Sequence, residues 1–239
     1  MILADSLVSG FTGSSFMGQC IVGVQLLGSV FMLAVIIGKS RELAFVSRMT
    51  RRFLRDFTSC QDVLEYYLNR RPGVDSTGVV GIYAQTCERL LKLLTPDVRS
   101  LLVGRESSGA AALTAREVEL VRGTCDHSLD EEEIRLESGM GGIATVVALA
   151  PMLGLLGTVW GVLDAFAEMG SAGSANLATI APSISAALVT TVVGLLIAIP
   201  GVVAFNRMNA TIRNISADME GFADELTGRI ACEFQGRAA

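Results

Sequence analysis

Long stretches of this 239-residue chain contain no charged residue. Asp, Glu, Lys and Arg are all absent from residues 6–38, 138–163 and 169–206. Only 18% of the residues are charged, whereas soluble domains carry about a quarter. Each charge-free window exceeds the roughly 20 residues that a helix needs to cross a bilayer core. The sequence therefore predicts three transmembrane helices and excludes an ordinary soluble domain.

The chain also lacks the patterns that mark metal centres and catalytic sites. Its five cysteines include no CxxC pair, which favours reduced structural thiols, and its one histidine, His127, has no nearby ligand partner. Neither a glycine-rich phosphate loop nor a nucleophile elbow is present. We therefore expect no enzyme activity, no cofactor, no metal site and no nucleic-acid partner.

Basic residues are missing from one side of the predicted membrane. All 19 Lys and Arg residues lie in residues 39–137 and 207–239. Because basic residues concentrate on the cytoplasmic side, we expect the N-terminus outside and the C-terminus inside. The start of the chain has no basic residue, so its first apolar stretch is expected to be a retained helix rather than a cleaved signal.

These observations divide the chain into seven expected segments. The fold class that they predict is an all-α membrane protein with three transmembrane helices and long helical cytoplasmic extensions. The segments are an external N-terminus (1–18), transmembrane helix 1 (19–38), a cytoplasmic helical region (39–137), transmembrane helix 2 (138–166), an external loop (167–178), transmembrane helix 3 (179–206) and a cytoplasmic helical C-terminus (207–239).

The cytoplasmic segments are expected to be helical because of their start signals and their periodicity. Three Ser/Thr-x-x-Glu/Gln capping boxes predict helix starts at Thr58, Thr114 and Ser128. In the C-terminal segment, apolar residues recur at steps of three and four and predict one buried helical face. They are Ile212, Ile215, Met219, Phe222, Leu226, Ile230 and Phe234. No proline follows Pro200, so transmembrane helix 3 is expected to continue into the cytoplasm as one helix.

Small and hydroxyl-bearing residues distinguish the second and third spans. Gly157 and Gly161 have the GxxxG spacing that permits close helix contact. Thr158 is a mid-membrane hydroxyl, for which a bond back to the carbonyl four residues earlier is one open interpretation. Ser183, Ala186 and Thr190 share one face of the third span. This face is either a tight helix–helix seam or the wall of a narrow polar path, and periodicity does not separate the two.

The segments APMLGLLGTVWGVLDAF (150–166) and NLATIAPSISAALVTTVVGLLIAIPGVVAFN (176–206) resemble the ExbB/TolQ family, whose relatives include the MotA flagellar stator subunit. The resemblance is close over about residues 140–210, and the three-span layout matches over the whole chain. MotA has four spans, which places this chain nearer to ExbB and TolQ.

The resemblance implies a homopentamer in the bacterial inner membrane, with the external side being the periplasm. The implied partners are an ExbD- or TolR-type single-span protein inside a central pore and a TonB- or TolA-type protein that spans the periplasm. The family's pore threonines correspond to Thr158 and Thr191, and Ser183, Ala186 and Thr190 are further expected pore-lining positions. Its membrane prolines correspond to Pro151, Pro182 and Pro200, which with Gly157 and Gly161 are expected to be structural.

One position departs from the family pattern, because the family commonly has Glu where this chain has Ala186. Ionisable groups inside a membrane are costly and usually functional, so the absence matters. The chain belongs to a lineage that relies on the partner's Asp alone, or carries an engineered substitution, or assembles but conducts poorly.

The leading functional prediction is a proton-channel motor subunit that uses the proton motive force to drive its periplasm-spanning partner. The alternative is a non-conducting membrane scaffold that recruits partners through its cytoplasmic helices. The missing carboxylate at Ala186 gives that alternative its weight.

Overall fold

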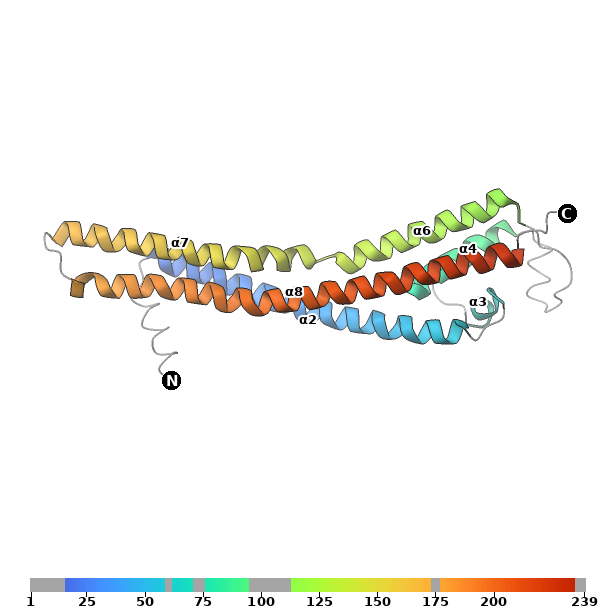
Figure 1. Ribbon diagram of the computed structural model, residues 1–239, viewed down its shortest axis with the longest axis horizontal. Helices are drawn as coiled ribbons and strands as arrows, with labels where there is room; N and C mark the ends of the chain where they lie inside the picture. Colours follow the sequence, from blue (N-terminus) through green and yellow to red (C-terminus); the bar gives the residue numbers. More distant parts are fainter. Residues whose placement is uncertain (1–15, 59–61, 71–75, 95–112, 173–176, 235–239) are drawn as a thin grey trace. The chain divides into compact units, whose positions relative to one another are not determined.

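The computed structural model describes residues 16–58, 62–70, 76–94, 113–172 and 177–234. Within these residues the regular structure is helical and contains no β-strand, which confirms the all-α prediction. In chain order the helices are α2 (Phe16–Thr58), α3 (Glu65–Arg70), α4 (Val79–Leu93), α6 (Ala115–Glu137), α7 (Met140–Ala172) and α8 (Leu177–Phe234) (Figure 1).

The helices belong to two compact units. Unit 1 comprises Met1–Ser40 and Gly139–Asn209, and unit 2 comprises Arg41–Ser138 and Ala210–Ala239. Three helical segments are long and apolar enough to cross a membrane, Phe16–Thr58, Ala115–Ser171 and Ile180–Phe234, and each overlaps one of the charge-free stretches of the sequence. The three predicted transmembrane helices are therefore confirmed as helices of suitable length and composition.

The second half of α8 buries its apolar stripe inside unit 2. All seven predicted stripe residues, from Ile212 to Phe234, are buried. As predicted, α8 runs unbroken from the third apolar window to Phe234. The sequence left open whether the stripe packs against the same chain or a neighbouring subunit. The structure places its partners in the same chain.

An aromatic cluster forms the centre of unit 2. Phe53 packs with its ring centroid 5.4 Å from that of Phe222 and 5.3 Å from that of Tyr83. The buried Tyr83 hydroxyl donates a 2.6 Å hydrogen bond to the Val63 carbonyl. The Arg229 guanidinium lies 4.6 Å from the centre of the Phe57 ring, a distance at which cation–π attraction adds to the packing. Unit 2 therefore has its own core.

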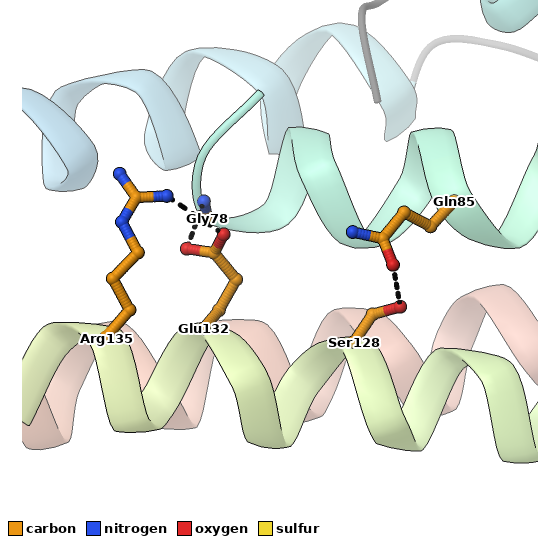
Figure 2. A network of polar contacts seen from close by, with 5 residues as sticks. All are labelled: Gly78, Gln85, Ser128, Glu132 and Arg135. Carbon is orange, nitrogen blue, oxygen red and sulfur yellow. Dashed lines mark hydrogen bonds and ion pairs between the residues drawn. The ribbon is translucent and has the colours of Figure 1, made fainter. Parts of the chain in front are cut away.

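Glu132 joins α6 to the start of α4 (Figure 2). Its carboxylate accepts a 2.9 Å hydrogen bond from the backbone N–H of Gly78, the N-cap residue of α4, and a 3.2 Å bond from Arg135. Gly78 has a φ of 65°, a conformation that glycine adopts without strain. One turn away, the Ser128 hydroxyl donates to the Gln85 side chain at 2.7 Å. Negative charge at a helix N-terminus is favourable, so this contact fixes where α4 begins.

The three predicted capping boxes have different outcomes. Thr114 caps α6 as expected, since its hydroxyl accepts from the Glu117 N–H while the Glu117 carboxylate accepts from the Thr114 N–H. The predicted helix start at Ser128 is wrong, because Ser128 lies inside α6 and bonds back to the Thr124 carbonyl. Thr58 is the last residue of α2, and its box partner Gln61 lies outside the described residues.

Candidate functional site

Glycines on α7 make a close contact with small residues on α8 in unit 1. A Cβ atom added at Gly161 would lie 2.5 Å from the Ala187 Cβ. One added at Gly154 would lie 2.8 Å from the Thr191 Cα, and one added at Gly157 would overlap the Thr190 side chain. The helices therefore approach as closely as the absence of these side chains allows. Within one chain this face is a tight seam, which was one of the two interpretations that the sequence left open.

Two adjacent hydroxyls cross the seam to one carbonyl. Thr190 and Thr191 both donate to the Gly154 carbonyl, with oxygen–oxygen distances of 3.1 and 2.8 Å. Thr190 also donates to Ala187 on its own helix, and its side chain is 1% exposed. Thr191 is only half-buried. It is therefore the member of the pair that is both part of the seam and accessible from outside it.

Gln25 of α2 inserts its side-chain amide between the two seam helices. Its Nε2 atom donates to the Ala150 carbonyl of α7 at 3.0 Å and to the Thr190 carbonyl of α8 at 3.3 Å. Gly194 leaves the room for it, since a Cβ there would lie 2.9 Å from Nε2 and would overlap the Ala150 carbonyl. Gln25 is 2% exposed, and its Oε1 atom is buried without a hydrogen-bond partner among the described residues.

Sequence reasoning missed Gln25, although a signal was present. An amide with apolar neighbours on both sides inside a membrane span is unusual, and VGVQLLG (22–28) has that form. The two donated bonds join all three membrane helices of unit 1 at one point. Gln25 therefore links α2 to both helices of the α7–α8 seam by hydrogen bonds.

The other expected pore residues lie at different places in unit 1. Thr158 is half-buried and donates to the Leu155 carbonyl at 2.7 Å, three residues earlier rather than the expected four. In the described part of the chain, Thr158 and Thr191 donate to separate carbonyls and not to each other. Ser183 is half-buried and donates to the Glu168 carboxylate at 3.1 Å. Ala186 is 3% exposed and so belongs to the packed interior of the single chain.

The membrane prolines do not end their helices. Pro151 lies inside α7, and Pro182 and Pro200 lie inside α8. Pro151 is half-buried, whereas the other two are exposed in the single chain. Each proline removes one backbone donor, which neighbouring helices, hydroxyls or water must compensate.

Among the described residues of unit 1, the two carboxylates lie toward the C-terminal end of α7. Asp164 and Glu168 lie one turn apart on α7, and the rest of the described seam offers hydroxyls, carbonyls and one amide. No group of three or more metal-ligating side chains exists among the described residues. The described residues thus offer hydrogen-bond donors and acceptors along the length of the seam.

Substitutions at Gln25 separate its hydrogen bonds from its size. The two bonds that Gln25 donates together stabilise the folded state by about 1–3 kcal/mol. Its buried Oε1, which has no hydrogen-bond partner among the described residues, destabilises the folded state by about the same amount. We therefore expect Gln25→Met to change the free energy of unfolding by less than about 1 kcal/mol, because both effects are removed together. Gln25→Glu places an acceptor oxygen against two carbonyls and is expected to cost about 3 kcal/mol or more. Thermal unfolding of the detergent-purified variants checks this ranking, and a Met variant as unstable as the Glu variant would contradict it.

The sequence of the chain is similar to those of known membrane proteins. The sequence model of the family described as "MotA/TolQ/ExbB proton channel family" matches residues 100–221. The chain is 30% identical over 233 residues, 95% of each chain, to the Tol-Pal system protein TolQ of Haemophilus influenzae. It is 38% identical over 120 residues to the biopolymer transport protein ExbB of Xanthomonas campestris, covering 50% of this chain and 47% of that protein. It is 41% identical over 99 residues to TolQ of Pseudomonas aeruginosa, covering 41% and 43%.

Proposed function

The chain belongs to the MotA/TolQ/ExbB proton channel family, and on that basis we propose that it is the proton-channel motor subunit of an ExbB/TolQ-type complex in the bacterial inner membrane. One observation carries the proposal. The segment matched by the family contains α7 and the membrane part of α8, so it includes the seam of Gly154, Gly157, Thr190 and Thr191. In this proposal the protein is a membrane motor-complex subunit and not an enzyme.

The proposed assembly is a homopentamer with two kinds of partner. A single-span protein of the ExbD/TolR type would occupy the central pore, and a TonB/TolA-type protein would carry the force across the periplasm. Support comes from the relatives, which are a Tol-Pal system protein and a biopolymer transport protein. The N-terminus would be periplasmic and the C-terminus cytoplasmic, since the basic residues of the chain flank the proposed inner ends of the three membrane helices.

Proton movement in this proposal uses half-buried hydroxyls and a carboxylate from the partner. Thr158 and Thr191 are both half-buried, and each carries a hydroxyl oxygen that can accept a further hydrogen bond. Because Ala186 supplies no ionisable group, the partner's Asp would carry the proton through the middle of the membrane. One charge crossing the membrane yields about 2.3 kcal/mol per 100 mV, so a few protons are enough to bias a conformational step.

Proton flux into liposomes tests the proposal directly. The protein is reconstituted with its single-span partner, a potassium-diffusion potential is imposed, and a pH-sensitive dye reports the internal pH. We expect flux above that of liposomes containing a partner with Asp→Asn. If flux stays at that background and Ala186→Glu does not raise it, the chain is instead a non-conducting scaffold that recruits partners.

A further inference from the structure

Unit 2 carries two exposed stripes of opposite charge that do not pair within the chain. The first lies on α2 and consists of four arginines on the side opposite the buried Phe53 and Phe57. Its members are Arg41, Arg48, Arg52 and Arg55. The second lies on α6 and consists of five acidic residues, of which Glu133 is half-buried and the others are exposed, on the side opposite the buried Val121 and Ser128. Its members are Glu119, Asp126, Asp130, Glu133 and Glu137. The exposed Arg122 lies on the same side, between Glu119 and Asp126.

None of these nine side chains forms an ion pair in the part of the chain that the structure describes. Arg55 donates only to a carbonyl of its own helix. Exposed charges often have no role beyond solubility. Four arginines on one helix, and on another helix five acidic residues with the single Arg122 among them, nevertheless give the charge complementarity that a binding surface requires.

The two stripes also have the same spacing. Both follow steps of seven, four and three residues, from Arg41 to Arg55 and from Glu119 to Glu133. These steps keep all members on one face of a helix. Several charges of one stripe can therefore face charges of the other at once, provided that the steps also agree in the direction in which the two helices meet.

We propose that the arginine stripe of α2 binds the acidic stripe of α6 on a second copy of this chain. The contact joins two different surfaces and is therefore heterologous, so it produces either a closed ring or an open filament. Copies in one membrane share one orientation, and the axis that relates them is the membrane normal. The contact therefore closes into a ring. This inference rests on the membrane assembly proposed above and identifies the surface that holds it together.

The direction of the helices determines the register of the contact. Within unit 2, α6 runs opposite to the second half of α2 (Figure 1). Rotation about the membrane normal preserves helix direction, so α2 of one copy faces an antiparallel α6 of the next. Forward steps of seven and four residues along α2 then match backward steps of seven and four along α6. The resulting pairs are Arg41 with Glu137, Arg48 with Asp130, and Arg52 with Asp126.

Apolar side chains beside the stripes support the same register. Phe45 is 59% exposed beside the arginines, and Ile134 is 71% exposed beside the acids. Viewed from the N-terminus of its own helix, each of the two side chains is displaced from the centre of its stripe in the same rotational direction. When two helices pack antiparallel, positions displaced in the same direction meet. In the register above, Phe45 lies within one residue of the position that faces Ile134. Ion pairs between exposed groups are individually weak, and burial of this apolar pair would add to them.

Charge reversal tests the contact. Arg48→Glu and Asp130→Arg, each made alone in the full-length protein, are expected to weaken association about fivefold per contact, the effect of turning one exposed ion pair into a repulsion. Combining the two is expected to restore the oligomer. Native mass spectrometry in mild detergent, at low and high salt, measures the oligomer fraction. Arg213→Glu on the exposed side of α8, outside both stripes, is the matched control and is expected to change nothing.

Disulfide cross-linking tests the register. Arg48→Cys and Asp130→Cys are placed in one chain whose Cys20, Cys60 and Cys232 are serine. In a heterologous ring each copy is linked to two different neighbours, so cross-linked species larger than the dimer are expected. In a two-fold contact both cysteines link the same two copies, so cross-linking would stop at the dimer. Arg48→Cys with Glu119→Cys is out of register, so this pair is expected to give no cross-linked species.

Two results would overturn the inference. One is an oligomer that no single charge reversal weakens. The other is a protein in which Arg48→Glu leaves the oligomer intact but abolishes binding to vesicles of anionic phospholipid, which would make lipid headgroups the partner of the arginine stripe. Neither readout requires proton flow. A ring with the expected cross-linked species larger than the dimer but no proton flux would contradict the proposed function and leave this contact established.

Discussion

Replacing Gly157 by alanine is expected to destabilise the membrane unit by about 1–3 kcal/mol, the usual cost of forcing an extra methyl into a packed interior. The new Cβ would overlap the Thr190 hydroxyl and lie 2.8 Å from the Thr190 Cβ. Thr190 has no space into which it can retreat, because it is 1% exposed and its hydroxyl is held by Gly154 and Ala187. The methyl group therefore separates α7 from α8 or breaks both of these hydrogen bonds.

A second glycine on α7 provides the control. A Cβ at Gly141 would meet nothing within 4 Å, so Gly141→Ala adds only helix propensity. Because Gly141 lies in the first turn of α7, the expected gain is at most about 0.5–1 kcal/mol, the value for a glycine inside a helix. Unfolding of the purified variants in detergent, by heat or by denaturing detergent, gives the difference. Equal stabilities of Gly157→Ala and Gly141→Ala would show that the seam is not tightly packed.

Most of the fold could be predicted from local patterns. The three charge-free windows predicted the membrane helices, because burial in lipid excludes charge over a whole helix length. The apolar stripe from Ile212 to Phe234 predicted the buried face of α8, since a helix repeats its face every three to four residues. The pattern failed at Ser128. A Ser-x-x-Glu sequence caps a helix only when the preceding residues leave the helical conformation, and here α6 continues through it.

The candidate site was less predictable because its contacts join distant parts of the chain. Gln25 and its acceptors are separated by 125 and 165 residues, and no local pattern encodes such a pairing. The glycines of α7 predicted close packing, but their spacing does not identify the residues that they contact. The burial of Ala186 and the half-burial of Thr191 follow from the rotation of α8 about its axis. That rotation depends on tertiary packing.

Thr191→Val is the sharpest test of the proposed proton path. Valine keeps the branched shape of threonine and removes only the hydroxyl. The Gly154 carbonyl retains the 3.1 Å bond from Thr190, so we expect a loss of unfolding free energy of no more than about 1 kcal/mol. The oligomer should therefore assemble. Thr191 is half-buried, and in this proposal its hydroxyl accepts from water or from the partner's carboxyl group.

We expect proton flux through Thr191→Val to fall about tenfold or more, equivalent to about 1.4 kcal/mol or more in the barrier. Thr145→Val is the matched control, because Thr145 is an exposed hydroxyl on α7 that bonds back to the Gly141 carbonyl and lies outside the seam. Its flux should equal that of the unmodified protein. Flux at the unmodified level in Thr191→Val would remove Thr191 from the path, whereas a loss of oligomer would mean that the hydroxyl serves packing. A loss of flux with the oligomer intact would place the proton path beside Thr191. In this proposal the partner's Asp supplies the carboxyl group there, because Ala186 has none.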